Sequence, residues 1–471
     1  MVGVGGIERL PDGYVAPQQL SRGQFIYAYS LITSLFFAWG FAYGLLDSLN
    51  KHFQSVFNIT KTQSTFMQVA YFGAYFLWAP WAGAFMRKVG YKKGIYMGLV
   101  LYSLGAIFYW PVAVKKSYPG FVICTFWISM GLSTLEVAAN TYLIVLGDPA
   151  QGAFRLTFSQ AFNGIGAFAG PLIASEYFFK GENATSLKNV QWTYLAVSAF
   201  GALLITLFYF AHLPEIDEAN LSDTLENQDD VKPLHKQWHT IFGFLAQFSY
   251  VGAQVLFEIT AYILFRLNEL YRSRFADTPS IAYSTSKGAL YYSYCQMVFA
   301  LGRFIGAAIL KYCDPAYSLT VYALACAMFT LGITQASGNG IVACIFLVFF
   351  FESICWPTIY ALAVSRLGKY TKLGGSLVVS GVGGGALFAP LQGVLADAID
   401  VRTSYWVSFI GFFLSAVYGF GMSIDGLRRR NIDGRTGKLK QDLMAELESP
   451  SGDEKEAIQE KEEVKIGVMK T

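Results

Sequence analysis

The clearest chemical signal in the sequence is a carboxylate followed by an amide in the middle of an apolar stretch. Residues 126–145 read FWISMGLSTLEVAANTYLIV, and Glu136 is the only charged side chain among them. A carboxylate in a segment that crosses hydrocarbon costs several kcal/mol unless it faces a partner or a water-filled cavity. Asn140 follows four residues later and therefore lies on the same face of a helix. This spacing indicates a site inside a membrane at which something polar is handled.

Three of the other carboxylates in or at the end of apolar stretches are further candidates. Asp47 closes the first long apolar run, and such a position, taken alone, is typical of a residue at the membrane interface. Glu258 and Glu352 lie inside later runs, so each is a candidate charge-pair partner or a residue that faces the interior of a helix bundle. The residue types leave both alternatives open.

Amides and aromatic rings recur along the same runs and would suit a sugar. An amide binds hydroxyl groups both as donor and as acceptor, and a flat ring stacks on the C–H face of a sugar. Hydrogen bonding between neighbouring helices explains any single one of these side chains equally well. The candidates are Gln68, Gln160, Asn163, Gln254, Trp356 and Tyr360.

The composition places these residues in a membrane protein. Of the 471 residues, 54% are hydrophobic and only 14% are charged, which is far too apolar for a soluble globule of this size. A net charge of +3 is too small to indicate nucleic-acid binding. The six cysteines lack metal-ligand spacing, and no hydrolase or metalloenzyme motif occurs. We therefore expect no enzymatic activity, no metal and no cofactor.

Twelve apolar runs are long enough to cross about 30 Å of hydrocarbon as helices. They predict an all-α membrane protein with two six-helix bundles at 25–212 and 241–424. An acidic linker at 213–240 joins the bundles. A polar segment at 1–24 precedes them, and the charged tail at 425–471 is expected to be disordered. The runs lie near 25–47, 65–86, 92–113, 120–145, 156–179, 192–212, 241–266, 286–310, 318–336, 340–364, 374–396 and 403–424.

The distribution of basic residues predicts the orientation of the chain. An even number of spans places both termini on one side, and the short loops on that side are the more basic, which is typical of the cytoplasm. Residues 1–23 lack the features of a cleaved signal peptide, so we expect the first run to be retained. The sequons at Asn58 and Asn183 then fall in outside loops, and the sequon at Asn220 falls in the inside linker. This arrangement suits a plasma-membrane protein with cytoplasmic termini.

Two basic, glycine-containing turns occupy related positions in the two halves. The turn GAFMRKVGYKKG at 83–94 combines glycines, which let helices pass closely, with the cations Arg87 and Lys88. Anchoring on the cytoplasmic side explains the charges alone, whereas glycine and charge together favour a gate. The sequence GRFIG at 302–306, with Arg303, stands near the exit of the eighth run. Matching turns in two halves suggest a transporter whose bundles rock against each other.

Several longer motifs recur in one family of carriers. They include LEVAANTYLIVLG, RLTFSQAFNGIGAFAG and GYKKG. Through them the chain resembles the L-fucose/proton symporter family of the major facilitator superfamily, in the form found in fungal members. The resemblance extends from about Leu31 to Phe420 with a break across the linker, and it implies the major facilitator fold and proton-coupled sugar uptake. The segments that carry it are 36–49, 68–75, 86–110, 131–147, 155–170, 246–254, 302–306 and 356–390.

The resemblance also implies roles for individual residues. In the family, the acidic residue that ends the first-helix motif and the glutamate of the Leu-Glu-x-Ala-Ala-Asn motif are tied to proton and sugar binding. These two positions fall on Asp47 and Glu136, which favours a functional over an interfacial role for Asp47. The Gln-x-Phe-Asn motif of the fifth helix falls on Gln160 and Asn163, which are implied sugar contacts.

The chain departs from this family around the expected cavity. Tyr43, Gly44 and Leu46 stand where the bacterial fucose carrier has paired asparagines and a further asparagine before the aspartate. Glu258 stands where an uncharged residue is usual. These differences surround the expected binding site, so they leave the identity of the sugar open.

We therefore predict a proton-coupled symporter of a monosaccharide, L-fucose or a related hexose or deoxyhexose, that works as a monomer in the lipid bilayer. Asp47 and Glu136 would carry the proton, because a site shielded from water disfavours the ionised form of a carboxylate. Glu136 would also bind the sugar together with Asn140, Gln160 and Asn163. Two alternatives remain open. The acidic linker invites a sugar receptor with a carrier fold, and the departures described above permit a carrier of another small polar solute.

Overall fold

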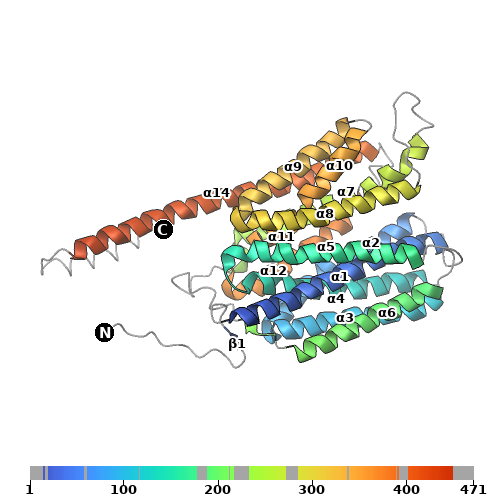
Figure 1. The fold of residues 1–471 in the computed structure, drawn as a ribbon, viewed down its shortest axis with the longest axis horizontal. Helices are drawn as coiled ribbons and strands as arrows, with labels where there is room; N and C mark the ends of the chain where they lie inside the picture. The colour runs from blue at the N-terminus through green and yellow to red at the C-terminus, as the bar shows by residue number, and fades with distance from the viewer. Residues whose placement is uncertain are drawn as a thin grey trace. The chain divides into compact units, whose positions relative to one another are not determined.

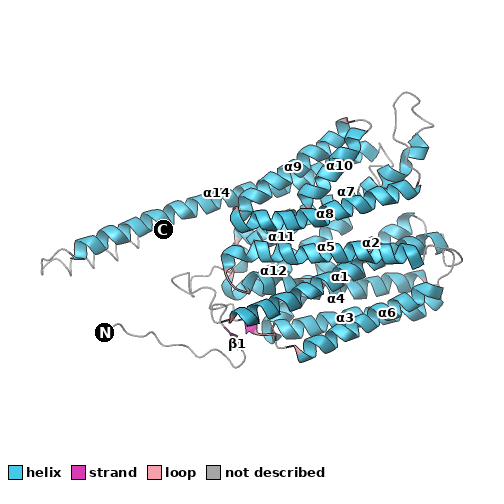
Figure 2. Cartoon of the chain, viewed as in Figure 1, coloured by secondary structure: helices cyan, strands magenta, loops and turns pink. Residues whose placement is uncertain are grey.

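The computed structural model of the chain describes residues 14–15, 20–57, 61–115, 117–177, 188–211, 213–216, 233–271, 285–336, 339–388, 390–391 and 401–448. Nearly all of these residues are helical, as Figures 1 and 2 show. Met1–Phe420 form one compact unit, and Gly421–Thr471 form a second.

The first half of the larger unit consists of six long helices, each of which coincides with one of the first six predicted runs. They are α1 (Arg22–Phe57), α2 (Lys61–Val89), α3 (Tyr91–Val114), α4 (Tyr118–Val145), α5 (Gly152–Tyr177) and α6 (Lys188–Phe210). α1 packs against α5, α2 packs against α4, and α3 contacts both α4 and α6 (Figure 1). The apolar runs therefore cover one another in a single helical bundle.

The second half contains the remaining helices. They are α7 (Trp238–Tyr271), α8 (Thr285–Tyr312), α9 (Pro315–Gln335), α10 (Asn339–Glu352), α11 (Cys355–Val364), α12 (Thr371–Ser380) and α14 (Val401–Glu448). α7 packs against α8 and α11, and α10 packs against α8 and α9. The two halves meet where α5 contacts α8 and where α2 and α4 contact α12.

The tenth predicted run is broken near its middle. We expected one helix over 340–364, but α10 ends at Glu352 and α11 begins at Cys355. The turn between them is held locally, because the Ser353 hydroxyl donates to the carbonyl of Phe350 at 2.6 Å. Residues 340–364 are apolar throughout apart from a few side chains, so hydropathy alone could not reveal the break. An interrupted helix at membrane depth is tolerated where its open backbone groups are buried in protein or line a cavity.

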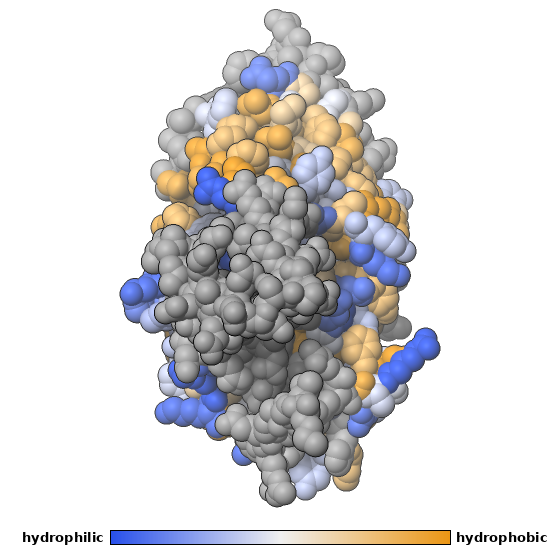
Figure 3. Space-filling view, turned by 90° about the vertical axis from the view of Figure 1, so that its left-hand side faces the viewer, coloured by the Kyte–Doolittle hydropathy of each residue, from blue (hydrophilic) through white to orange (hydrophobic). Residues whose placement is uncertain are grey.

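The outer surface of the larger unit is rich in apolar side chains. Eight segments of the described residues are long and apolar enough to cross a membrane, and one of them, Gly340–Val364, comprises α10, the break and α11 together. Large side chains such as Leu77, Phe210 and Met328 are exposed, and apolar residues, coloured orange, cover much of the coloured surface in Figure 3. Polar residues such as Thr33 and Gln247 are buried instead. This distribution is expected of a protein whose sides face the lipid of a membrane.

A short pair of strands is the one departure from the all-α prediction among the described residues. β1 (Tyr14–Val15) pairs in parallel with β2 (Glu215–Ile216), which links the segment before α1 to the chain after α6. The Glu215 carboxylate accepts hydrogen bonds from the backbone N–H groups of Tyr91 and Lys92 at 2.9 and 2.8 Å. Because these N–H groups have no partner within the helix, Glu215 caps the start of α3.

Arg155 fixes the connection between α4 and α5. Its guanidinium donates to the backbone carbonyls of Leu143, Ile144 and Asp148 at 3.1, 3.1 and 2.8 Å. The side chain is almost completely buried. A planar cation at the end of a helix satisfies carbonyls that lack partners in the helix and interacts favourably with the helix dipole.

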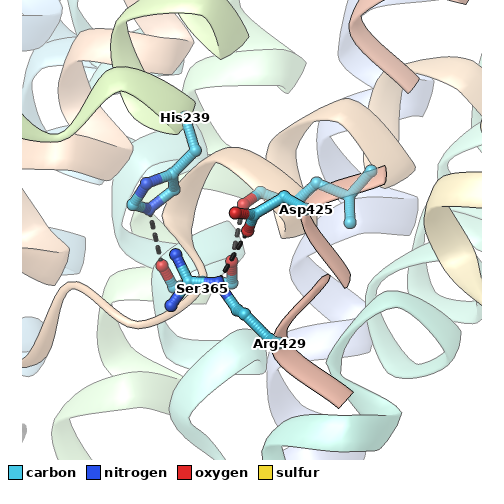
Figure 4. A network of polar contacts seen from close by, with 5 residues as sticks. His239, Ser365, Asp425 and Arg429 are labelled. Carbon is cyan, nitrogen blue, oxygen red and sulfur yellow. Dashed lines mark hydrogen bonds and ion pairs between the residues drawn. The ribbon is translucent and has the colours of Figure 1, made fainter. Parts of the chain in front are cut away.

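The start of α7 is held against the chain that follows α11. His239 places Nε2 at 2.9 Å from the carbonyl oxygen of Ser365 (Figure 4). The Thr240 hydroxyl donates to the Ala363 carbonyl at 2.9 Å, and the Tyr418 hydroxyl donates to the His239 carbonyl at 3.0 Å. These bonds fix the beginning of α7 and the end of α11 relative to each other.

The smaller unit begins inside α14, which continues to Glu448. We expected disorder from residue 425 onward, whereas α14 runs through 425–448. An ion pair one turn apart stabilises the helix there, since Arg429 Nε donates to Asp425 at 2.7 Å (Figure 4). The sequence that follows is also rich in Leu, Lys, Gln and Glu, which favour helix.

Candidate functional site

The candidate site is centred on Glu136 in the most deeply buried stretch of α4. Every residue from Gly131 to Val145 is buried, and Glu136 itself is 4% exposed. α4 lies this close to α3 because Gly131 has no side chain. A Cβ atom there would lie 2.5 Å from the backbone nitrogen of Tyr102. Close packing of small residues therefore carries a carboxylate into the interior of the protein.

Polar groups from three helices act on the Glu136 carboxylate. They are Tyr75 of α2, Asn140 of α4 and Arg303 of α8. Asn140 is completely buried beside this carboxylate. Its amide offers two N–H donors and an acceptor oxygen, which is more than one carboxylate can satisfy. Glu136 and Asn140, which share one face of α4, can therefore bind a polar ligand.

Arg303 joins the two halves at this level. Its Nη1 donates to the carbonyl of Gln160 at 2.8 Å and to Oδ1 of Asn163 at 3.4 Å. Its Nε donates to the carbonyl of Ser353, in the break after α10, at 3.3 Å. The guanidinium carbon also lies 4.4 Å from the ring centroid of Phe299. A single cation therefore contacts α5 from one half and the broken helix from the other.

The structure places Arg303 inside α8 and not at its exit, and the gate role stays a prediction. The prediction placed it at the exit of the eighth helix, but α8 continues to Tyr312 and Arg303 is buried well before that end. The GRFIG motif does not form a turn, because its residues belong to a continuous helix. The motif's glycines serve packing instead, since a Cβ atom at Gly302 would lie 2.9 Å from the carbonyl of Phe350.

Asn163 is presented to the site by close contact between α1 and α5. A Cβ atom at Gly40 would lie 2.0 Å from the carbonyl oxygen of Asn163, so only glycine permits this approach. The Asn163 amide nitrogen donates to the carbonyl of Phe36 at 3.2 Å. Its oxygen is then oriented toward Arg303. Gln160, one turn earlier, is also buried.

The aromatic candidates Trp356 and Tyr360 lie on α11 and stack on each other. Their ring centroids are 5.5 Å apart and their planes differ by 8°. The Tyr360 hydroxyl and the methyl group of Thr141 both lie against Gly375 of α12. Tyr360 therefore approaches the residue next to Asn140 and belongs to the contact between the two halves.

The remaining sequence candidates are less closely tied to this cluster. Gln68 of α2 and Gln254 of α7 are half-buried. Asp47 and Glu258 belong to α1 and α7, but their side chains lie outside the described residues, as do the sequon residues Asn58 and Asn183 in full.

The two halves also meet where α2 ends and α12 begins, at a set of four residues that we call the closed end. They are Arg87, Tyr91, Tyr370 and Lys372. The Lys372 ammonium lies 4.2 Å from the ring centroid of Tyr91, and the Arg87 guanidinium lies 5.8 Å from the ring centroid of Tyr370. These are cation–π distances. Lys88 is exposed.

Several functional residues were missing from the sequence prediction. Tyr75 lies in an apolar run, and only its spacing of four from Tyr71 and its place near Trp78 mark a shared face. Trp78 donates from Nε1 to the Thr134 hydroxyl at 2.9 Å, close to Glu136 along α4. Lys372 was not among the predicted site residues. Its aromatic partner is distant in the sequence, so no local pattern could identify the pair.

Comparison with known proteins identifies the family. Residues 29–378 match the Major Facilitator Superfamily. The chain is 31% identical over 407 residues to the glucose/galactose transporter of Brucella abortus biovar 1 (strain 9-941), covering 85% of this chain and 95% of that protein. It is 32% identical over 395 residues to the L-fucose-proton symporter of Escherichia coli (strain K12), covering 79% of this chain and 88% of that protein.

Solved structures agree with these relatives. A crystal structure of the major facilitator transporter FucP in the outward conformation has a TM-score of 0.71 and 29% identity, covering 85% of this chain and 99% of that one. The proton:xylose symporter XylE shares the fold with a TM-score of 0.65 at 13% identity, covering 85% and 96% of the two chains. The chain is therefore an integral membrane protein that belongs to the major facilitator superfamily.

Proposed function

We propose that this protein is a proton-coupled monosaccharide symporter that works by alternating access. The observation that carries the proposal is the buried Glu136, which lies with Asn140 and Arg303 at the contact between the two halves of the fold. The relatives named as an L-fucose-proton symporter and a glucose/galactose transporter support this assignment. We propose that the substrate of this protein is L-fucose or a related hexose or deoxyhexose.

Glu136 is suited to carry the proton. A carboxylate that is 4% exposed pays a large desolvation cost when it is ionised, so protonation stabilises the closed site and exposure to the cytoplasm favours release. Asp47, which the family resemblance pairs with Glu136, is proposed as the group that first receives the proton. The proton is the coupling ion, and we propose no other cofactor.

The sugar would bind between Glu136 and α5. The buried amide of Asn140 can donate and accept hydrogen bonds with hydroxyl groups. Asn163 and Gln160 lie at the Arg303 contact, so a sugar that engages their side chains would also act on the junction between the halves. Trp356 and Tyr360 offer ring faces from the other half, and Gln68 and Gln254 are proposed as outer contacts.

Alternating access would open and close the closed end defined above. Arg87 and Lys372 of opposite halves hold aromatic partners across it, and each cation–π contact is worth about 0.5–1 kcal/mol at an exposed site and more where it is desolvated. Weak contacts of this kind can break in each cycle. We therefore propose that Arg87 and Lys88 belong to a cytoplasmic gate. In the structure described above, the carrier would be closed on the cytoplasmic side.

We further propose that the carrier lies in the plasma membrane with both termini in the cytoplasm and that it works as a monomer. Asn58 and Asn183 would then be available for glycosylation outside. A C-terminal tag should remain inaccessible to antibody on intact cells and become accessible after permeabilisation. Labelling of intact cells would overturn the orientation and both glycosylation sites together.

The decisive experiment is uptake of radiolabelled sugars into proteoliposomes that contain the purified chain. The panel is L-fucose, galactose, glucose and arabinose, each measured at two external pH values against empty liposomes. We expect saturable uptake of at least one sugar that increases at the more acidic external pH. Binding without uptake would favour the sugar receptor, and failure to bind any of them would favour a carrier of another solute.

A further inference from the structure

A second buried carboxylate lies near the site but has no role in the function proposed so far. Glu352 is the last residue of α10, directly before the break that precedes α11, and it is completely buried. Discontinuous helices often form the binding and coupling sites of transporters, because their ends present free backbone groups at the middle of the membrane. A charged residue at that depth is expensive and is expected to serve a function.

Titratable and charged groups face Glu352 from every described helix packed around it. The Tyr250 hydroxyl of α7 donates to the Glu352 carbonyl at 2.9 Å, and Tyr250 lies within electrostatic range of both Glu352 and Arg303. Three thiols also lie nearby. Of these groups, only Arg303 is a cation. The set consists of Tyr250 of α7, Cys295 and Arg303 of α8, Cys326 of α9 and Cys355 of α11.

Arg303 contacts the chain beside Glu352 and also acts on Glu136. On one side it donates to the carbonyl of Ser353, the residue after Glu352, at 3.3 Å. On the other side it bonds to Gln160 and acts on the Glu136 carboxylate. An arginine side chain keeps its charge at any physiological pH. One permanent cation therefore acts on Glu136 of the first half and contacts the backbone directly after Glu352 in the second half.

The charges of this trio balance only when one carboxylate is protonated. With both ionised, the buried trio would carry an uncompensated negative charge, which is strongly destabilising. With one proton, the other carboxylate and Arg303 neutralise each other. Interacting groups of this kind titrate as a set, so the proton affinity that transport reports belongs to the trio and not to Glu136 alone.

Resting on the function proposed above, we propose that Glu352 is a positioning residue of the transport cycle that competes with Glu136 for Arg303. When Glu136 is ionised, Arg303 is held toward the first half and stabilises contact between α5 and α8. When Glu136 is protonated and a sugar occupies Asn163, Arg303 is held by Glu352 in the second half. The contact between the halves is then weakened, which allows them to move.

The test measures sugar uptake into proteoliposomes across external pH for the parent chain, Glu352→Gln, Glu352→Leu and Glu352→Asp. Sugar exchange at equal pH on both sides serves as the control for a folded, binding-competent carrier. Removing the competing carboxylate leaves Arg303 to ionised Glu136, so a more acidic solution is needed to protonate Glu136. We expect the pH midpoint of uptake to move down by about one unit or more in both neutral variants.

Glu352→Asp should keep the parent midpoint, because a carboxylate remains to compete for Arg303. A midpoint that is unchanged in Glu352→Gln or Glu352→Leu would overturn the proposal. So would loss of folding in both neutral variants with Glu352→Asp active, since the charge would then be required for structure. Absence of pH-dependent uptake in the parent chain would instead refute the proton-coupled function, and the Glu352 proposal would fail with it.

Discussion

Replacing Gly83 with alanine should force the two halves apart at the closed end. Gly83 of α2 faces α12 so closely that a Cβ atom would lie 2.2 Å from the Ser376 hydroxyl and 2.8 Å from the carbonyl oxygen of Lys372. The hydroxyl can rotate away, but the Ser376 Cβ atom, which would lie 2.3 Å from the added carbon, and the backbone carbonyl cannot. Because non-bonded heavy atoms prefer about 3.5 Å or more, α2 and α12 would have to separate by roughly half an ångström or more.

The size of the effect follows from this overlap. Overpacking of this kind costs about 1–3 kcal/mol, and only the conformation with the closed end shut contains the overlap. The intrinsic gain of alanine over glycine in a helix is shared by both conformations and cancels. The equilibrium should therefore move toward opening by about fivefold to a hundredfold. Gly73→Ala is the matched control in α2, since a Cβ atom there meets nothing within 4 Å.

The displacement can be measured with a pair of spin labels across the closed end. Lys88 and Lys369 are both exposed, so each can be replaced by a labelled cysteine after exposed Cys313 is changed to serine. Pulsed EPR in proteoliposomes should report a larger population at long distance for Gly83→Ala and a parent-like distribution for Gly73→Ala. Identical distributions for both variants would refute the argument that Gly83 permits closure.

Three further changes test other contacts. Tyr91→Leu should increase the open population by a few-fold in the same EPR assay, because Lys372 then loses its cation–π contact with the Tyr91 ring. Tyr91→Phe keeps an aromatic ring and should resemble the parent. Equal effects of the two variants would exclude the cation–π contact. Glu215→Ala should lower the free energy of unfolding by about 1 kcal/mol through loss of the cap on α3, read as a lower melting temperature in detergent. Arg155→Lys should lower it by about 1–3 kcal/mol, since an ammonium cannot reproduce three bonds from a planar fork. Unchanged melting temperatures would contradict both stability arguments.

Much of the helical architecture was predictable from the sequence. Hydropathy identified the helices because lipid imposes a simple rule, a run of about 20 apolar residues for each crossing. The break between Glu352 and Cys355 was not predictable in this way, since it depends on partners such as Tyr250 that satisfy the open backbone. The helix beyond residue 425 was also missed, because a high charge content was read as disorder.

The candidate site was predicted only in part. Glu136 and Asn140 share a helix face through local periodicity, and the structure places both in the buried centre. The spacing of Gln160 and Asn163 was equally local, but their partner Arg303 comes from another helix and could be identified only from the packed structure. The GRFIG motif therefore suggested that Arg303 lies in a turn. In the packed structure Arg303 instead lies where α8 contacts α5.

The central claim is that sugar and proton move together through Glu136. The most direct measurement is the pH of a weakly buffered suspension of cells that express the chain, recorded when a transported sugar is added. We predict transient alkalinisation outside the parent cells, and none for Glu136→Gln, which should still exchange labelled sugar across the membrane. Sugar uptake without alkalinisation in the parent, or equal alkalinisation in the Glu136→Gln variant, would contradict the account.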